Sequence, residues 1–175
     1  MPIKSEPTEY PLIDSDPHFW RVVRYFRPAD VGTIGLCTGL SCGYVYLMNK
    51  WQPSHNKFGL APVMRLTACT GLVGGFLIAY ARSSYRFWGT WENAREVSKD
   101  YAEMRERAEK GLPLYGATEM SEYAQGVAMR QSVRSQGRLA VFPWFNFANH
   151  KFHNTEQDYF KGIEHLRPES YRTHY

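Results

Sequence analysis

The chain has 175 residues, with 21 Lys and Arg against 17 Asp and Glu, and a formal net charge of +4. Basic and acidic residues are interleaved wherever they are dense, which argues against nucleic acid as a partner. The three cysteines all lie in apolar stretches, so they indicate neither a disulfide framework nor a zinc motif. We expect them to act as small apolar side chains.

The mean hydropathy of -0.48 conceals an uneven distribution, because most aliphatic residues lie in two blocks. We divide the chain into an N-terminal segment (1–30), an apolar hairpin (31–81) and a polar C-terminal extension (82–175). The acidic, proline-rich N-terminus resembles neither a cleavable signal peptide nor an Arg-rich transit peptide. We therefore expect any targeting information to be internal.

Residues 31–48 contain no charged residue. As a helix they would be about 27 Å long, close to the roughly 30 Å of a bilayer's hydrocarbon core. We predict a first transmembrane span here. A second span is predicted at 63–81, where Arg65 is the only charge and can extend to the interface.

The short loop between the blocks predicts an antiparallel hairpin, and the fold class is an all-α membrane protein. The alternative is a soluble helical hairpin buried in a larger protein, but nothing else in this chain could bury it. More Lys and Arg flank the outer ends of the two spans than the loop. By the positive-inside rule, both termini should face the more negative compartment.

Small residues recur every fourth position in both blocks, and this spacing places them on one face of each helix. Such faces let another backbone approach closely, so we expect packing between the two spans or against a partner's helices. The residues are Gly35, Gly39 and Gly43 in the first span, and Thr67, Gly71, Gly75 and Ala79 in the second.

Asp16 followed by Pro17 is typical of a helix start, and a short helix to Arg27 would separate an apolar side from a basic one. Arg21, Arg24 and Arg27 are then candidates for contact with phospholipid headgroups at the membrane surface. The alternative is docking on another protein, because a docked helix needs the same pattern.

The C-terminal extension has a predicted polar helix at about 91–110, with Glu103–Arg107 and Glu106–Lys110 pairs on its wet side. A weaker helix is predicted at about 119–134. The extension as a whole is poor in aliphatic residues, so it should hardly form a core of its own. Beyond the second helix the chain is aromatic as well. We expect this largely extended tail to lie across a partner's surface.

No residue pattern in the chain predicts catalysis or a cofactor. His150 and His153 lack the further ligands of a metal site, so solvent or partner contact is favoured for them. The spans contain neither a histidine for haem nor an acid for a proton relay, and no glycine-rich phosphate loop follows a strand. We expect no catalytic, metal-binding or cofactor-binding residues and no enzyme activity.

Residues 10–19 (YPLIDSDPHF) and 21–28 (RVVRYFRP), followed by the two-span hairpin, resemble the fungal 21 kDa accessory subunit of mitochondrial NADH:ubiquinone oxidoreductase, respiratory complex I. The resemblance extends over most of the chain. It implies a supernumerary subunit of the membrane arm in the mitochondrial inner membrane, without redox centres and with both termini in the matrix.

Its partners would be other membrane-arm subunits and membrane phospholipid, with cardiolipin as one candidate. Two further functions remain open at this level. One is an independent inner-membrane assembly or translocation factor, and the other is an enzyme or carrier acting on lipid or quinone, which has the least support from the residues.

Overall fold

The computed structural model describes residues 8–53, 59–132 and 145–168, and all regular structure within them is helical. Five α-helices are described, followed by the short 3-10 helix η1 (Glu164–Leu166). The helices are α1 (Phe19–Arg24), α2 (Pro28–Trp51), α3 (Ala61–Phe87), α4 (Ala94–Glu109) and α5 (Glu122–Ser132). The chain forms two compact units: Tyr25–Ser83 is the helical unit, and the segments before and after it form the polar unit.

Helix α2 extends three residues beyond the predicted span of 31–48 at each end. Pro28 occupies the first turn, where its missing N–H costs nothing, and the carboxylate of Asp30 accepts a hydrogen bond from the Arg27 amide at 2.8 Å. The helix therefore starts at a capping interaction and not where the apolar run begins. At about 36 Å, it is long enough to cross a hydrocarbon core.

Helix α3 continues six residues past the predicted end at residue 81, through a polar stretch to Phe87. Both long helices have the length and composition of membrane spans. They also expose many large apolar side chains, as expected for helices that face lipid or other helices. The exposed ones are Val31, Leu36, Leu40, Tyr44, Tyr46, Leu47, Met48, Trp51, Val63, Leu66, Leu72, Val73 and Ile78.

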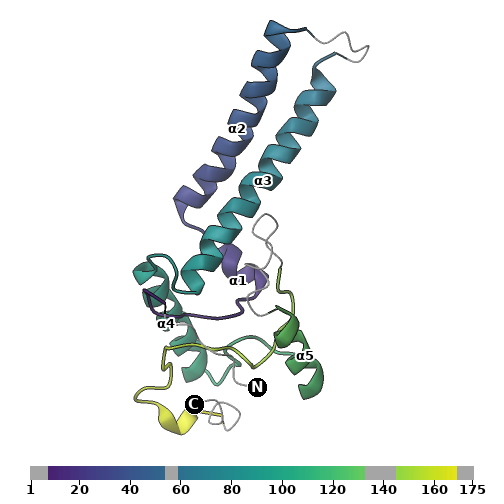
Figure 1. The fold of residues 1–175 in the computed structure, drawn as a ribbon. Coiled ribbons are helices and arrows are strands. Elements are labelled where there is room, and N and C mark those ends of the chain that lie inside the picture. The colour runs from purple at the N-terminus through teal and green to yellow at the C-terminus, as the bar shows by residue number, and fades with distance from the viewer. Residues whose placement is uncertain (1–7, 54–58, 133–144, 169–175) are drawn as a thin grey trace. The chain divides into compact units, whose positions relative to one another are not determined.

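Within the helical unit, α2 and α3 lie side by side and run in opposite directions (Figure 1). A Cβ on Gly71 would lie 2.9 Å from the Cα of Thr38, and one on Gly75 would lie 2.8 Å from the Cα of Ile34. The two backbones approach this closely because α3 has no side chains at these two positions. Arg82 also donates a hydrogen bond of 2.8 Å to the Thr33 hydroxyl, which joins the two helices near one end.

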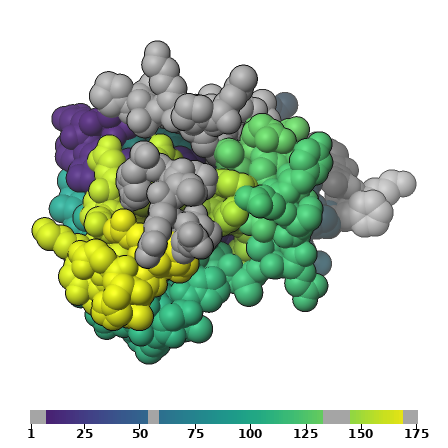
Figure 2. Space-filling model, turned by 90° about the horizontal axis from the view of Figure 1, so that it is seen from below, coloured from purple at the N-terminus to yellow at the C-terminus, as the bar shows by residue number. Residues whose placement is uncertain are grey.

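The polar unit is built around the N-terminal segment, residues 8–18, which forms backbone hydrogen bonds on two sides. Ile13 donates to the carbonyl of Phe87 at 3.0 Å, at the end of α3. On the other side Ser15 donates to Asn154, and Glu156 donates to Leu12, both at 3.1 Å. Figure 2 shows the C-terminal segment, residues 145–168, in yellow beside the purple N-terminal segment.

Helices α4 and α5 correspond to the two helices predicted in the extension, at about 91–110 and 119–134, although both are shorter. The predicted i,i+4 pairs of α4 are present, with Lys110 Nζ 2.5 Å from Glu106 and Arg107 Nε 4.0 Å from Glu103. Residues 133 and 134, and the start of the aromatic run at 141–144, lie outside the described residues.

The extension has a small core, contrary to our expectation that it could hardly form one. Met104 and Ala108 of α4 pack with Leu114, Tyr159 and Phe160. Large aromatic side chains compensate for the scarcity of aliphatic ones, because each buries a large apolar area. The described part of the tail, residues 145–168, is mostly irregular and packs on its own chain, whereas the prediction was a largely extended tail across a partner's surface.

Candidate functional site

A cluster of buried charged and polar side chains lies at the centre of the polar unit, and it starts at Asp14 and Asp16. Both aspartates are at most 1% exposed. The Asp16 amide donates to Asp14 Oδ1 at 2.9 Å, a local turn that directs both carboxylates inward. The prediction that Asp16 caps a helix is wrong. Helix α1 begins only at Phe19, and the Asp16 carboxylate accepts a hydrogen bond from Ser132 instead.

Arg21 of α1 joins three segments of the polar unit. Its Nη1 lies 2.5 Å from Asp14 Oδ2, and its Nη2 pairs with Asp100 of α4. Burial opposes the guanidinium charge, but Asp100 and Asp14 outweigh burial and raise the pKa of Arg21 above its ordinary value. The arginine therefore stays charged and fixes α1 against α4.

His150 and His153 attach the C-terminal segment to the aspartate pair. His150 Nε2 is 2.8 Å from Asp16 Oδ2, and His153 Nδ1 is 2.8 Å from Asp14 Oδ1. Their rings stack at 4.4 Å between centroids, and Tyr115 stacks on the other face of His153 at 3.7 Å. The prediction of solvent or partner contact was wrong for both, because their partners are buried carboxylates of the same chain.

The cluster favours the ionised form of Asp14. Burial raises the pKa of this carboxyl, but the charge and hydrogen bond of His153, together with Arg21, outweigh burial and lower it below its ordinary value. Tyr159 donates a hydrogen bond of 2.6 Å to Asp100. Burial and the nearby carboxylates raise the pKa of both Tyr115 and Tyr159, so both phenols remain neutral.

The three carboxylates of the cluster all have partners from other segments of the polar unit. Asp14 and Asp100 pair with the Arg21 guanidinium, and Asp14 and Asp16 contact the rings of His153 and His150. The arrangement is therefore suited to joining segments by ion pairs. Each carboxylate is already engaged by this chain's own donors, as expected for a structural cluster.

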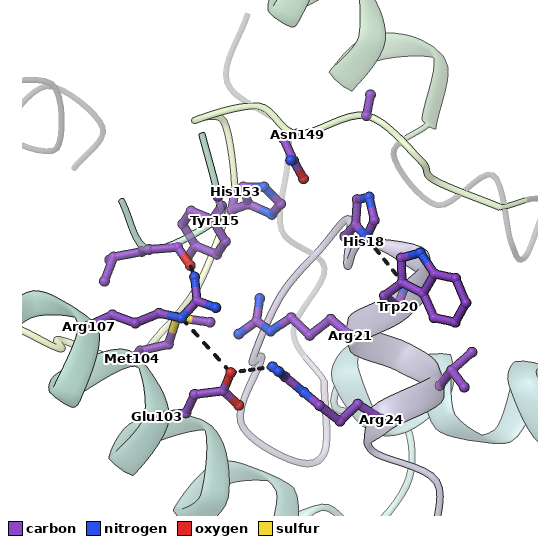
Figure 3. A pocket seen from close by; sticks show the side chains of 14 residues that line it. His18, Trp20, Arg21, Arg24, Glu103, Met104, Arg107, Tyr115, Asn149 and His153 are labelled. Atoms are coloured by element: carbon purple, nitrogen blue, oxygen red, sulfur yellow. Dashed lines mark hydrogen bonds and ion pairs between the residues drawn. The ribbon is translucent and has the colours of Figure 1, made fainter. Parts of the chain in front are cut away.

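A cavity of about 380 Å³ lies beside this cluster, between α1, α4 and the C-terminal segment (Figure 3). Arg21, Tyr115 and His153 belong to both the cluster and the cavity wall. Arg24 of α1 and Arg107 of α4 approach the same carboxylate, Glu103. The cavity thus has a basic side next to an aromatic one.

The three arginines predicted to contact phospholipid headgroups have different environments. Arg21 is buried in the ion-pair cluster, which differs from the surface position expected from helix periodicity. Arg24 is exposed at the cavity, and Arg27 immediately precedes α2. Sequence reasoning missed Asp14, Asp100 and the role of the histidines, although the Asp-Ser-Asp repeat beside an arginine was the available signal.

The small residues predicted to pack also differ between the two long helices. Gly71 and Gly75 lie against α2, and Ala79 is fully buried. Gly35, Gly39 and Gly43 have open space around their Cα atoms, because α2 presents Ile34, Cys37 and Thr38 to α3 instead.

The matches to known protein families include residues of both units. The pattern of the family described as "NADH-ubiquinone oxidoreductase complex I, 21 kDa subunit" matches residues 7–92, and that of the "C-terminal of NADH-ubiquinone oxidoreductase 21 kDa subunit" matches residues 101–165. The NADH-ubiquinone oxidoreductase 20.9 kDa subunit of Neurospora crassa is 48% identical over 152 residues, covering 85% of this chain and 79% of the relative. The chain belongs to the complex I 21 kDa subunit family.

Membership in the 21 kDa subunit family agrees with the resemblance found in residues 10–28. The N-terminal family match includes Asp14, Asp16 and Arg21 together with both long helices. The C-terminal match includes Tyr115, His150, His153 and Tyr159. Most residues of the cluster thus lie in the two matched regions, and Asp100 lies in the short gap between them.

Proposed function

We propose that the chain is an accessory subunit of the membrane arm of complex I, NADH-ubiquinone oxidoreductase, in the mitochondrial inner membrane. The observation that carries this proposal is the family match over both units, including 48% identity to a complex I subunit. The two long apolar helices fit insertion as a transmembrane hairpin.

In this role the chain contributes binding energy and no catalytic groups. The buried cluster supports a structural role, because its charged groups are already paired within the chain. The exposed apolar side chains of α2 and α3 supply surface for neighbouring membrane helices and lipid. The Gly35, Gly39 and Gly43 face of α2 would accept a helix of a neighbouring subunit at close range.

Both termini would lie in the matrix under this proposal. Arg24 and Arg27 precede α2, and Arg95 and Lys99 follow α3, whereas the described loop flanks carry Lys50 and Arg65. The positive-inside rule favours the more negative compartment for the arginine-rich flanks. Arg24 and Arg27 would then be close to the headgroups of that leaflet, where an anionic lipid such as cardiolipin would be a suitable partner.

The test is to solubilise mitochondria in a mild detergent, separate complexes on a native gel, and quantify this chain by mass spectrometry in the band with NADH dehydrogenase activity. We expect it there in a one-to-one ratio with the core subunits. Recovery mainly in small or free fractions would contradict the proposal and favour a transient assembly or translocation factor. Protease protection of tagged termini in mitoplasts tests the matrix orientation separately.

A further inference from the structure

The cavity in the polar unit combines a basic side with an apolar one. Arg24 and Arg107 lie near Glu103 on the basic side, as Figure 3 shows. Trp20, Val23, Met104 and Leu114 supply apolar surface. The volume of about 380 Å³ falls in the range of small-molecule sites, roughly 300–1,000 Å³.

The charges of the lining do not cancel. Of the lining residues, all of which lie in the described part of the chain, Glu103 alone is acidic. Arg24 pairs with it, and Arg107 Nε lies 4.0 Å from it, so two guanidinium groups are near a single carboxylate. Arg21 pairs with Asp14 and Asp100 inside the cluster. The cations available at the cavity are therefore Arg24 and Arg107, which share the single carboxylate of Glu103.

Further polar groups in the wall can complete the shell of an anion. His153 donates from Nδ1 to Asp14, and its buried Nε2 has no hydrogen-bond partner among the described residues. With Nδ1 as the donor, that nitrogen can accept a hydrogen bond from a P–OH group. Asn149 Nδ2 donates a hydrogen bond of 3.2 Å to the Ala117 carbonyl, and its second amide hydrogen can be donated to a ligand.

We propose that this cavity binds the phosphate group of an organic phosphate, with Arg24 and Arg107 as the cationic ligands. Guanidinium groups match the geometry of phosphate oxygens and form charge-assisted hydrogen bonds with them. The apolar wall at Trp20 and Val23 would contact the organic part. A membrane phospholipid and a soluble phosphate ester both supply this chemistry, and the experiment separates the two.

The experiment uses the full-length protein in nanodiscs of phosphatidylcholine. One arm adds glycerol 3-phosphate and measures binding by ³¹P NMR line broadening. The other arm replaces a tenth of the lipid by phosphatidic acid and measures retained lipid by native mass spectrometry. Arg24→Gln/Arg107→Gln should weaken binding at least about 10-fold, because each lost charge-assisted hydrogen bond is a strong one.

The matched control is Arg95→Gln, which removes a positive charge from an exposed position of α4 outside the cavity. Binding should then change less than about 2-fold, since the charge of a distant exposed residue is screened. A second test leaves every arginine in place. Trp20 is 66% exposed at the cavity, so Trp20→Glu should weaken binding more than Trp20→Gln, because both lose the apolar contact but only the glutamate adds charge repulsion.

If Arg24→Gln/Arg107→Gln weakens binding in the lipid arm, the ligand is a membrane phospholipid. If it weakens binding in the soluble arm, the ligand is a soluble phosphate ester. Far-UV circular dichroism of each variant establishes that it is folded. The proposal is overturned if neither probe binds, or if Arg95→Gln weakens binding as much as the double substitution. Equal binding by Trp20→Glu and Trp20→Gln would also overturn it. None of these outcomes bears on membership in complex I, which the native-gel experiment tests.

Discussion

Gly89 is the residue at which the N-terminal segment approaches the turn after α3 most closely. Its φ is +71°, and a Cβ there would lie 2.2 Å from the carbonyl oxygen of Tyr10. The Tyr10 amide in turn donates to the Gly89 carbonyl at 3.0 Å. Glycine is required both for the left-handed backbone and for the space. The position of the N-terminal segment therefore depends on one missing side chain.

Gly89→Ala should destabilise the polar unit by about 1–2 kcal/mol for the backbone conformation, with a further roughly 1–3 kcal/mol for the clash. The matched control is Gly111→Ala, since Gly111 has φ +65° but nothing within 4 Å of its Cβ position. Urea unfolding in detergent, followed by circular dichroism, compares the two. Equal losses would mean that the N-terminal segment does not pack against Gly89.

Asp14 gives the polar unit a predictable response to acid. Because its pKa is lower in the folded chain, the folded state binds fewer protons than the unfolded state near that pKa. Its contribution to stability is complete above the ordinary carboxyl pKa of roughly 3.9. The contribution is lost as the pH falls through that value towards the folded pKa.

We therefore expect the unfolding midpoint of the native chain to drop between pH 6 and pH 3, and to drop less in Asp14→Asn. The asparagine cannot ionise, so its variant lacks the linked proton uptake at this position. Urea titrations at the two pH values measure the difference. A drop of the same size in both proteins would show that other carboxyl groups cause the acid sensitivity.

At the scale of elements, the contact between α2 and α3 depends on the glycine face of α3. Gly71 and Gly75 admit the backbone of α2, whereas the corresponding glycines of α2 lie on a different face. Small residues at four-residue spacing identify faces where backbones can approach, but do not identify which face meets which helix. One glycine face is thus occupied by this chain, and the other has open space beside it.

Gly75→Leu should separate the two helices, because its Cβ would lie 2.8 Å from a backbone atom that cannot rotate away. The expected cost is about 1–3 kcal/mol or more, measured as a lower thermal midpoint in nanodiscs. Gly39→Leu should leave this midpoint unchanged, since its Cβ position is open. If a neighbouring subunit packs there, Gly39→Leu should still reduce recovery in the complex I band. Unchanged stability in Gly75→Leu would contradict the observed packing.

At the scale of the whole molecule, the polar unit is held together by contacts between segments far apart in the chain. Residues 145–168 supply His150, His153 and Tyr159 to carboxylates of the N-terminal segment and α4. Four buried atoms of the cluster, Asp16 Oδ1, Arg21 Nε, His150 Nδ1 and His153 Nε2, have no hydrogen-bond partner among the described residues. The C-terminal segment is therefore part of the fold of its own chain, whatever further contacts it makes in a complex.

Removing residues 145–175 should unfold the polar unit, because three buried carboxylates would lose their histidine and tyrosine partners. Limited proteolysis should then cleave α4 rapidly while α2 and α3 remain protected in a nanodisc. Tyr159→Phe is a milder test with an expected cost of about 1–3 kcal/mol, and Tyr123→Phe, at a tyrosine that is 79% exposed, is its control. A protease-resistant α4 in the truncated protein would contradict this role.

The sequence by itself determined the two apolar helices, the polar helix α4 with its Glu–Lys and Glu–Arg pairs, and the resemblance to the 21 kDa subunit family. These features are local, because an uncharged run or an i,i+4 spacing carries its own physical meaning. Only the tertiary structure decided that Arg21 is buried, which glycine face meets the other helix, and that the tail packs on its own chain. The partners in those contacts are 79 residues apart for Arg21 and Asp100, and 134 apart for Asp16 and His150. No local periodicity encodes such pairings, since burial of a charge depends on partners brought together only by folding.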